Sequence, residues 1–353
     1  MKKFWGFLSF LLLISCNEKP VADRNIFADF DVTVELSDPV TVVENLLNPD
    51  DLSICNSFML FRENSDSTTV ALFDTSGNHI INFLWKGRGP GETINTLDVS
   101  FYNDEIIQAS VHPESVFLYD VKQLLSGVKM PDKVLSLDQG EYASSTIIRC
   151  AEDVLFYVGK DINNEVNNTR FCFRNMQDDA LYPFGEYPEE DINIADFPQE
   201  DYSKQTAYQG RPVLKPDHTK IVVPYYYAVG FDIIDMNKRA VEYSNFYQYP
   251  GVECTYIPQI KASVVKRNPE KYRGFLDACC SDKSIYFLFS SKRMKDSSNA
   301  MGRYVLKYNW DGKSECCYVL DREIFSIAID KDEQHLYVCS HDIEGGTIDR
   351  YLL

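Results

Sequence analysis

One unit recurs six times along this 353-residue sequence: a turn that contains an aspartate, followed by a run rich in aromatic and β-branched residues. The aspartates are Asp51, Asp104, Asp153, Asp217, Asp282 and Asp332, at successive steps of 53, 49, 64, 65 and 50 residues. Further alternating runs follow each copy, joined by hairpin signals such as Gly77-Asn78 and Asp311-Gly312. Repetition of this length predicts an array of small sheets, each of which buries its faces only against its neighbours.

The pattern predicts an all-β fold, a six-bladed β-propeller with four-stranded antiparallel blades. The last unit is one strand short, whereas Phe30, Val32, Val34 and Leu36 alternate with polar residues near the start of the chain. We expect this N-terminal strand to pair with the final blade, because such pairing closes the ring and hides two sheet edges. The alternatives are a large β-sandwich or two unrelated β domains.

The first sixteen residues have the layout of an export signal. Lys2 and Lys3 precede an apolar run at 4–14, and a serine stands before Cys16. Eleven helical residues rise about 16 Å against about 30 Å of hydrocarbon, so this run is too short to span a bilayer comfortably. The sequence LISC at 13–16 resembles a bacterial lipobox, in which the cysteine is lipidated. The alternative is an ordinary buried cysteine beside a cleavage site.

These features predict the domain organisation and the location of the protein. We expect a lipoprotein signal peptide at 1–15, a polar tether at 16–28 that carries a covalent lipid such as palmitate on Cys16, and a single propeller domain at 29–353. Acyl chains hold a protein at a membrane, since each buried methylene contributes about 0.8 kcal/mol. The protein is therefore predicted to be anchored in the cell envelope, and the sequence does not decide which membrane face it occupies.

Composition narrows the classes of partner. The formal net charge is −18, from 35 basic and 53 acidic residues, and such a surface repels nucleic acid and anionic lipid at a distance. Ten cysteines leave nine besides Cys16, an odd number that cannot pair completely within one chain. The adjacent pairs Cys279-Cys280 and Cys316-Cys317 lack the spacing of a metal knuckle, which favours small buried hydrophobes over a disulfide framework.

The loop Gly87-Arg88-Gly89-Pro90-Gly91-Glu92 raises the question of phosphate binding. A Walker-type loop needs Gly-Lys-Ser/Thr at the start of a helix, whereas here Glu92 stands in that position and a strand-like pattern follows. Pro90 also removes one backbone donor from a candidate anion nest. The loop is therefore predicted to be structural, a tight connection between blades one and two.

Two insertions supply the candidate ligand surface. The segment 178–203 holds nine acidic and no basic residues, interleaved with aromatics that include Tyr182, Phe184 and Tyr187. Exposed aromatic side chains in an acidic loop are suited to bind a basic partner, a cation or a sugar ring. The alternative is that these side chains pack on the blade beneath the loop. The basic segment 256–275 is spaced for a short helix that caps the channel or lies on the surface. If Tyr225 and Tyr227 are alternate residues of one strand, their side chains lie on the same face of it. We expect them either to form a stacking floor in the central channel or to pack between blades.

Three stretches carry a family resemblance: GRGPGE at 87–92, GRPVLKPDHTKIVV at 210–223 and DKSIYFLFSSK at 282–292. Together with the lipobox-like run and six repeats, they make the chain similar to TolB-like six-bladed β-propeller lipoproteins of Gram-negative bacteria. The resemblance implies a TolB-like or NHL-like propeller in the cell envelope, and it supplies no catalytic residues. Extra length in blades three and four departs from the pattern.

Enzymatic signals are weak, because the five histidines show no HExxH spacing and the sequence has no GxSxG elbow. The leading hypothesis is a lipid-anchored binding module that presents one loop face to an envelope protein, peptide or glycan. The alternative is a metal-dependent hydrolase or lyase with a divalent cation in the central channel. Its ligands would come from several blades, and the sequence does not identify them.

Overall fold

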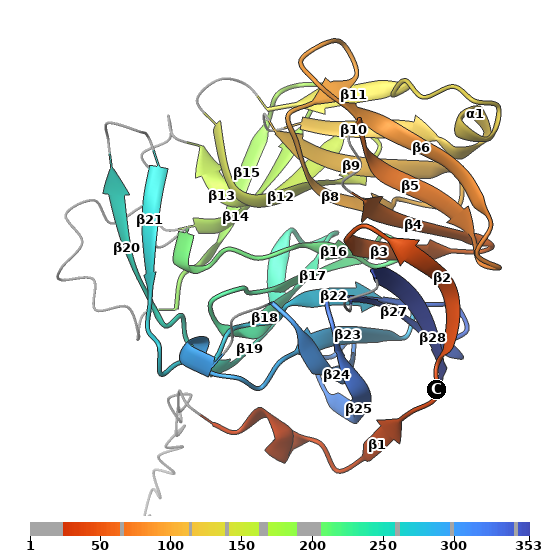
Figure 1. Cartoon of the computed structure of the whole chain (residues 1–353). Coiled ribbons are helices and arrows are strands. Elements are labelled where there is room, and N and C mark those ends of the chain that lie inside the picture. Colours follow the sequence, from red (N-terminus) through yellow and green to blue (C-terminus); the bar gives the residue numbers. More distant parts are fainter. Residues whose placement is uncertain are drawn as a thin grey trace, which may run out of the picture.

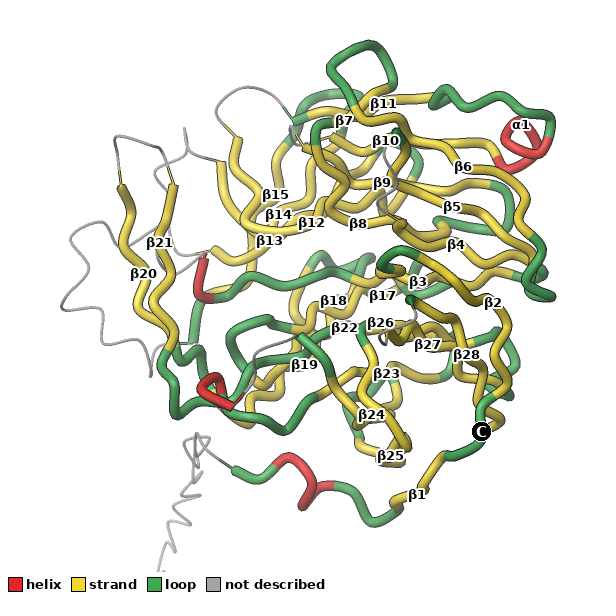
Figure 2. Tube along the Cα trace, viewed as in Figure 1, coloured by secondary structure: helices red, strands yellow, loops and turns green. Residues whose placement is uncertain are grey.

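The structure, a computed structural model, is a ring of six β-sheets (Figure 1). It describes residues 24–63, 67–112, 115–137, 141–161, 169–188, 206–257, 262–296, 300–341 and 345–353. Strands make up nearly all of its regular structure, and the helices are short (Figure 2). The six-bladed propeller predicted from the repeats is confirmed. The signal-like segment 1–15 and Cys16 lie outside the described residues, and no helix within the described part is long and apolar enough to cross a membrane.

Each blade is an antiparallel sheet whose strands follow one another from the channel outward. Blades one to three contain β3 (Pro49–Cys55), β4 (Phe58–Glu63), β5 (Thr68–Asp74) and β6 (His79–Lys86); β8 (Asn95–Phe101), β9 (Ile106–His112), β10 (Ser115–Asp120) and β11 (Lys133–Ser136); and β12 (Glu141–Ala151), β13 (Val154–Asp161), β14 (Thr169–Asn175) and β15 (Leu181–Glu186). Blades four to six contain β16 (Val213–Leu214), β17 (Lys220–Pro224), β18 (Val229–Asp235) and β19 (Ala240–Gln248); β22 (Asp277–Cys280), β23 (Ser284–Phe289), β24 (Gly302–Asn309) and β25 (Ser314–Ile324); and β26 (Ser326–Ile329), β27 (His335–His341), β28 (Gly346–Leu352) and β2 (Val40–Leu46). The remaining elements are β1 (Thr33–Leu36), β7 (Glu92–Thr93), the hairpin β20 (Val252–Ile257) and β21 (Ala262–Arg267), α1 (Val121–Leu125), and the 3-10 turns Ile26–Asp29 and Met294–Asp296.

The repeated aspartates mark the turn between the first and second strands of a blade. Asp104, Asp153, Asp217, Asp282 and Asp332 all lie in that turn in blades two to six. The first copy differs: Asp51 lies within β3, and the corresponding turn in blade one falls at residues 56–57. Asp51 therefore has a different role from the turn aspartates, and its contacts lie in the central channel.

Six separate hydrophobic cores fill the ring, one between each blade and the next. Between blades one and two, for example, Leu72 and Phe83 pack with Val99 and Ile107. The interface between blades six and one is built in the same way, from residues of β2, β3, β4, β5, β26, β27 and β28. Because every blade is covered on both faces by a neighbour, no blade has a core of its own, and the ring must close for any sheet to be buried.

The ring is closed by β2, which pairs antiparallel with β28 of the last blade, with Val43 opposite Ile348. The expected closing strand, 30–36, was the wrong one. Its described strand β1 pairs in parallel with β25 of blade five, with Leu36 opposite Leu320. The physical reason is the short path to blade one: β2 ends at Leu46, three residues before β3 starts, so only β2 can occupy the outer position of the last blade.

The packed part of the chain begins upstream of the expected boundary at residue 29. Ile26 is buried in the core between blades four and five, and the Phe27 ring lies 4.8 Å from that of Tyr304, centroid to centroid. The backbone nitrogen of Arg24 donates to the carbonyl oxygen of Tyr247, at 3.2 Å. The remainder of the expected tether, 16–23, lies outside the described residues.

Two local expectations in blade four and after it are corrected. The basic segment after residue 256 forms part of the antiparallel hairpin β20–β21, not a helix, with Cys254 opposite Val265. The hairpin projects from the side of the ring (Figure 1). Tyr225 and Tyr227 lie in the turn between β17 and β18, because Pro224 ends β17 there, so they are not alternate residues of one strand.

The glycine-rich loop connects β6 to β7, which pairs with β6 in parallel, and then to β8. It folds around its own glutamate: the Glu92 carboxylate accepts a hydrogen bond from the Gly89 nitrogen at 2.8 Å. A Cβ on Gly87 would lie 1.9 Å from a Glu92 carboxylate oxygen, and Gly91 has a φ of +72°. These two positions require glycine, and the carboxylate occupies the space that a bound anion would need.

We define two faces of the ring by the direction of the inner strands β3, β8, β12, β16, β22 and β26. The strand-entry face is the one where these strands begin, and the strand-exit face is the one where they end. In each antiparallel blade the second-to-third-strand turn and the link to the next blade lie on the strand-entry face. Both insertions, which follow β15 and β19, therefore leave from the strand-entry face.

Replacement of Val43 by alanine tests the closing strand. Val43 is 8% exposed and packs in the core between blades six and one, whereas Val40 of the same strand is 57% exposed. We expect Val43→Ala to lower the free energy of unfolding by about 2 kcal/mol, from two lost methyl groups and a residual cavity. Val40→Ala, the matched control, should change it by less than about 0.5 kcal/mol. Urea unfolding of both variants measures the difference, and equal effects would contradict the role of β2.

Candidate functional site

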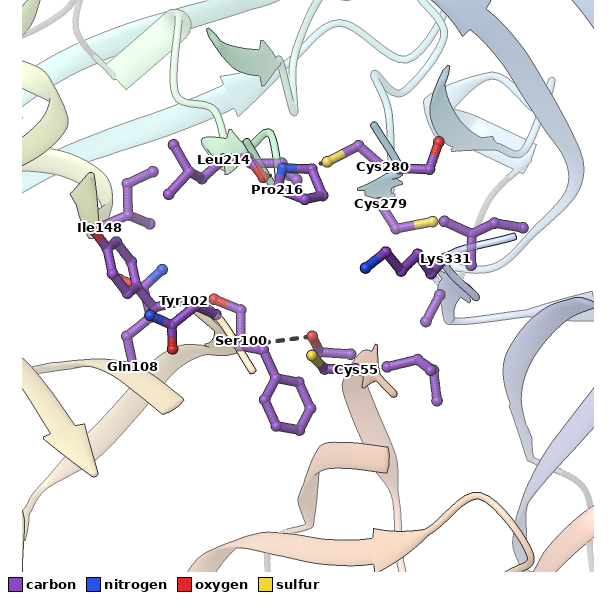
Figure 3. Close-up of a pocket in the computed structure, with 18 of the residues that line it drawn as sticks. Cys55, Ser100, Tyr102, Gln108, Ile148, Leu214, Pro216, Cys279, Cys280 and Lys331 are labelled. Carbon is purple, nitrogen blue, oxygen red and sulfur yellow. Dashed lines mark hydrogen bonds between the residues drawn. The ribbon is translucent and has the colours of Figure 1, made fainter. Parts of the chain in front are cut away.

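A pocket of about 660 Å³ occupies the central channel. Its walls are the ends of the inner strands and the turns that follow them, so it belongs to the strand-exit face. Figure 3 shows side chains from several blades around one central space. Among its lining residues are Cys55, Ser100, Tyr102, Gln108, Ile148, Leu214, Pro216, Cys279, Cys280 and Lys331. This arrangement brings together residues that are nearly 280 positions apart in the sequence.

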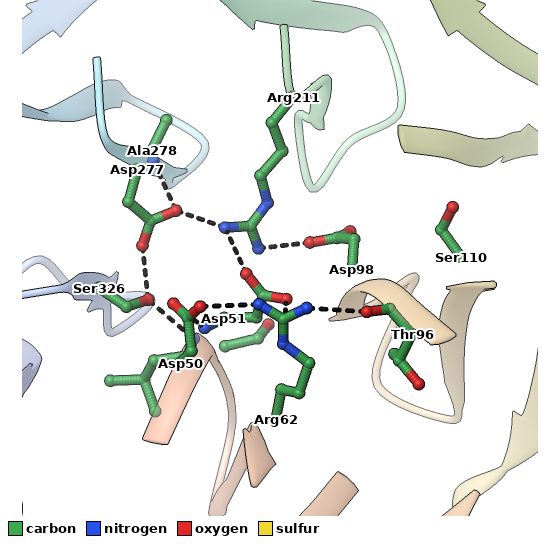
Figure 4. Close-up of polar contacts among 12 residues, drawn as sticks. Asp50, Asp51, Arg62, Thr96, Asp98, Ser110, Arg211, Asp277, Ala278 and Ser326 are labelled. Atoms are coloured by element: carbon green, nitrogen blue, oxygen red, sulfur yellow. Dashed lines mark hydrogen bonds and ion pairs between the residues drawn. The ribbon is translucent and has the colours of Figure 1, made fainter. Parts of the chain in front are cut away.

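Arg211 crosses the channel beneath this pocket (Figure 4). Its guanidinium contacts Asp51 of β3 at 3.1 Å, Asp98 of β8 at 2.5 Å and Asp277 of β22 at 2.5 Å. The three carboxylates come from blades one, two and five, and Arg211 itself immediately precedes blade four. One cation therefore joins four blades, and the cluster separates the pocket from the strand-entry face.

A second arginine and a serine extend the cluster. Arg62 of β4 lies 3.2 Å from Asp51, and it donates to the carbonyl oxygen of Thr96 at 2.7 Å. On the other side, the Ser326 hydroxyl of blade six donates to the Asp277 carboxylate at 2.5 Å and accepts from the Leu52 nitrogen at 2.9 Å. Figure 4 shows this chain of contacts around the channel. Ser326 thus connects blades five, six and one.

Burial controls the ionisation of these carboxyl groups. It raises the pKa of Asp51 to about 8, although the charges of Arg211 and Arg62 oppose the shift. Burial also raises the pKa of Asp277, again against the charge of Arg211. Proximity to two further carboxylates, Asp50 and Asp98, adds to the shift at Asp51. The cluster therefore holds more acidic groups than its two arginines fully offset, and a pKa of about 8 favours the protonated form of Asp51 near neutral pH.

Three free thiols line the pocket. The Cys55 thiol donates to the Asp104 carboxylate at 3.1 Å, and burial together with that contact raises its pKa to about 12. Burial also raises the pKa of Cys279 and of Cys280, whose thiol donates to the Leu214 carbonyl at 3.3 Å. Thiols with raised pKa values are protonated and poorly nucleophilic at neutral pH. In this pocket the three protonated thiols act as small side chains of the wall.

The mouth of the pocket carries mixed charge. Lys331 points into the central space (Figure 3), and no carboxylate of the described residues lies within ion-pair distance of it. Asp104 and Asp282 lie in the turns of two other blades, and Asp217 in a third is paired with Lys215. With apolar walls at Ile148 and Leu214, the site offers donors, acceptors and apolar surface to one ligand.

The predicted aromatic surface is placed at blades three and four. Tyr182 of β15 is 37% exposed, and the guanidinium of Arg239 lies 3.8 Å from its ring centroid. Phe184 of the same strand is half-buried and stacks on Phe173 at 5.2 Å, centroid to centroid. Both side chains belong to the outer edge of blade three, far from the channel. The rest of the acidic insertion, 189–203, lies outside the described residues.

The other three predicted residues are separated from one another. Tyr187 is buried, with its ring centroid 5.4 Å from that of Tyr208. Tyr225 is fully buried, and its hydroxyl donates to Asp232 in the core between blades three and four. Tyr227 is half-buried in the β17–β18 turn on the strand-entry face. The structure therefore does not bring these residues together as one surface.

Sequence reasoning missed the residues of the central pocket and its floor. Arg211 stands within the quoted stretch GRPVLKPDHTKIVV, but no spacing connects it with Asp98 or Asp277, which lie on other blades. One signal was available, namely the extra aspartate at Asp51, since Asp50 and Asp51 stand ahead of the turn where the other blades carry theirs. A buried strand position occupied by an acid indicates a buried cation opposite it. Within the described residues no cluster of three or more His, Cys, Asp or Glu side chains has the geometry of a metal site.

A comparison with protein families agrees with the fold. The family model of the TolB-like 6-blade propeller-like proteins matches residues 73–332. Among solved structures, the β-propeller domain of Cps50 (Swd1) from Myceliophteria thermophila is similar, with a TM-score of 0.45 and 8% sequence identity over 90% of this chain and 99% of that chain. No curated protein is significantly similar to the sequence.

The pH dependence of stability tests the ionisation of Asp51. The folded protein holds this proton up to about pH 8, whereas an unfolded chain releases it near 3.8, so rising pH between these values favours unfolding. Asp51→Asn removes the titration. We expect the stability of the wild type minus that of the variant to fall as pH rises from about 4 to about 8, and to be flat above. Urea unfolding at several pH values measures this difference; a constant or rising difference would show that Asp51 is ionised in the folded state.

The reactivity of Cys55 tests the geometry of the pocket wall. Asp104→Asn removes a negative charge that opposes the thiolate, so the pKa of Cys55 should fall and its alkylation at pH 7 should become several-fold faster. Iodoacetamide labelling followed by peptide mass spectrometry resolves Cys55 from the other cysteines. Asp282→Asn, in the turn of blade five, is the matched control and should leave the Cys55 rate unchanged. An unchanged rate in Asp104→Asn would mean that the thiol and the carboxylate do not interact.

Proposed function

The chain belongs to the TolB-like six-bladed propeller family, and from that membership we propose that it is a binding module of the cell envelope that receives a segment of a partner protein or peptide in its central pocket. The observation that carries this proposal is the pocket itself. Its volume of about 660 Å³ lies within the range of roughly 300–1,000 Å³ that ligand sites occupy. It is closed at one end and open at the strand-exit face, so a ligand enters from one side.

The chemistry of the walls suits a polypeptide. Gln108 and Ser100 supply donors and acceptors, while Ile148 and Leu214 supply apolar surface. Lys331 binds a carboxylate, and Asp104 or Asp282 binds a basic group, so an extended segment with both charges fits the mouth. A floor fixed by Arg211 and its three carboxylates needs no rearrangement when the ligand binds, which reduces the entropic cost of binding.

Lipid attachment at Cys16 would determine how the pocket is presented. Arg24 is bonded to Tyr247 at the end of β19, which lies on the strand-entry face. The first described residue, Arg24, thus lies toward the strand-entry face, and the pocket opens on the opposite one. In the lipidated protein that we propose, the anchor and the pocket mouth are on opposite sides of the ring, so the pocket is accessible to partners in the envelope.

Obstruction of the pocket tests this function. Ser100 of β8 points into the pocket (Figure 3), and Ser100→Trp should fill much of its free space. We expect a partner that is cross-linked to the wild type in envelope extracts to be recovered at least tenfold less with Ser100→Trp. Quantitative mass spectrometry of the cross-linked material gives the ratio.

The matched control is Ser37→Trp, because Ser37 is exposed in the link between β1 and β2, away from the pocket. Circular dichroism and urea unfolding of both variants establish that each is folded. Equal recovery of the partner with all three proteins would show that the pocket does not bind it. Recovery of glycan in place of protein would keep the site and change the ligand class.

A further inference from the structure

A group of cations on this acidic protein begins within the hairpin strand β21. Eight basic residues lie within thirty positions: Lys266, Arg267, Lys271, Arg273, Lys283, Lys292, Arg293 and Lys295. Five of them have interaction partners. Arg293 and Lys295 contact Glu270 at 2.8 and 2.9 Å, and Lys292 pairs with Glu323. Lys266 and Lys271 also have interaction partners. Glu270 is thus shared by two of these cations.

Arg267 and Arg273 are different. Neither makes an ion pair with any carboxylate in the described part of the chain, although each has neighbours that do. The guanidinium of Arg267 lies 5.5 Å from the ring centroid of Tyr227, in a cation–π contact. Arg273 is half-buried, which makes an uncompensated charge there more costly than at the surface.

Backbone hydrogen bonds hold the two arginines on either side of Tyr227. The Gly251 nitrogen donates to the Tyr227 carbonyl at 3.3 Å, and the Asn268 nitrogen donates to the Gly251 carbonyl at 2.7 Å, next to Arg267. The Gly274 nitrogen donates to the Tyr226 carbonyl at 2.9 Å, next to Arg273. The chain that carries both side chains is thus tied at both ends to one turn.

The electrostatic consequence is visible at Arg273. Burial lowers its pKa, and the charge of Arg267 lowers it further. Two cations that repel each other, with no ion-pair partner in the described part of the chain and with their backbone fixed, favour the binding of an anion near both of them. Guanidinium groups donate in planar pairs that match the oxygens of phosphate, and two arginines balance the charge of a dianion.

We propose that Arg267 and Arg273, beside Tyr227 on the strand-entry face, form a binding site for a phosphate group. The site is distinct from the central pocket, which opens on the strand-exit face beyond the Arg211 cluster. It also gives a role to Tyr227, the half-buried member of the predicted aromatic set. Because Arg24 lies on the same face, the phosphate of a lipid headgroup and free phosphate are the two sources that the experiment must distinguish.

Inorganic phosphate is the first probe. With the full mature chain carrying Cys16→Ala, so that no acyl chain is present, we expect phosphate to raise the melting temperature above that in sodium chloride of equal ionic strength. The double variant Arg267→Gln/Arg273→Gln should bind phosphate at least tenfold more weakly by isothermal titration calorimetry. Without phosphate the double variant should melt at the same or a higher temperature than the wild type, because the repulsion between the two cations is gone. A merely structural role of the arginines would lower it.

Arg239→Gln is the matched control, since Arg239 is also an exposed arginine that stacks on a tyrosine, Tyr182, elsewhere on the ring. It should leave phosphate binding unchanged. The source is then tested by flotation with phosphatidylcholine vesicles that contain or lack phosphatidylglycerol. Binding that requires phosphatidylglycerol and both arginines indicates a headgroup, whereas phosphate binding without flotation indicates a soluble phosphate ligand.

Two outcomes would overturn the proposal. One is a phosphate effect no larger than that of chloride at equal ionic strength. The other is equal phosphate affinity in the wild type and the double variant. Neither outcome bears on the central pocket, because Ser100 and the Arg211 cluster are untouched by these substitutions.

Discussion

Every sheet in this protein depends on the sheet beside it. The six hydrophobic cores lie between blades, and the core between blades six and one is of the same kind as the other five. Closure is therefore a condition for burial and not an addition to a finished fold. Pairing of β2 with β28 satisfies that condition, and the short link from Leu46 to Pro49 makes the closing strand continuous with the first blade.

Closure also creates the need for Arg211. Six inner strands converge on one axis, and three of them present a carboxylate to it: Asp51, Asp98 and Asp277. An isolated buried carboxylate is very unfavourable, and removal of one partner from a buried pair costs about 3–5 kcal/mol. The Arg211 guanidinium contacts all three, with Arg62 as a second cation beside Asp51, and the pocket lies on the strand-exit side of this cluster. The floor of the pocket and the junction of the blades are thus the same interaction.

The sequence was informative where the physics is local or repeated. Alternation and hairpin residues predicted six sheets, because each blade repeats the same turn chemistry. The contacts of Arg211 could not be predicted, since Asp98 and Asp277 are more than sixty residues away on either side and nothing local connects them. The alternation of 30–36 favoured that segment as the closing strand, whereas 40–46 lacks regular alternation and closes the ring because of its short link to β3. The hairpin β20–β21 was misread as a helix because its apolar residues also fit helical spacing.

The two faces of the ring differ in the connections that they receive, and this follows from where the chain inserts extra residues. The strand-entry face receives the links between blades, so the hairpin and its arginines lie there, beside the end of the chain that leads to Cys16. The strand-exit face receives the short turns after the inner strands, which carry Asp104, Asp217 and Asp282 around Lys331, and the third-to-fourth-strand connections, which lie farther from the channel. Short turns leave the channel mouth uncovered, while the long links surround the opposite end. In the two proposals made above, one partner binds at the open mouth and a different, anionic one at the opposite face, with the buried cluster of Arg211 between the two sites.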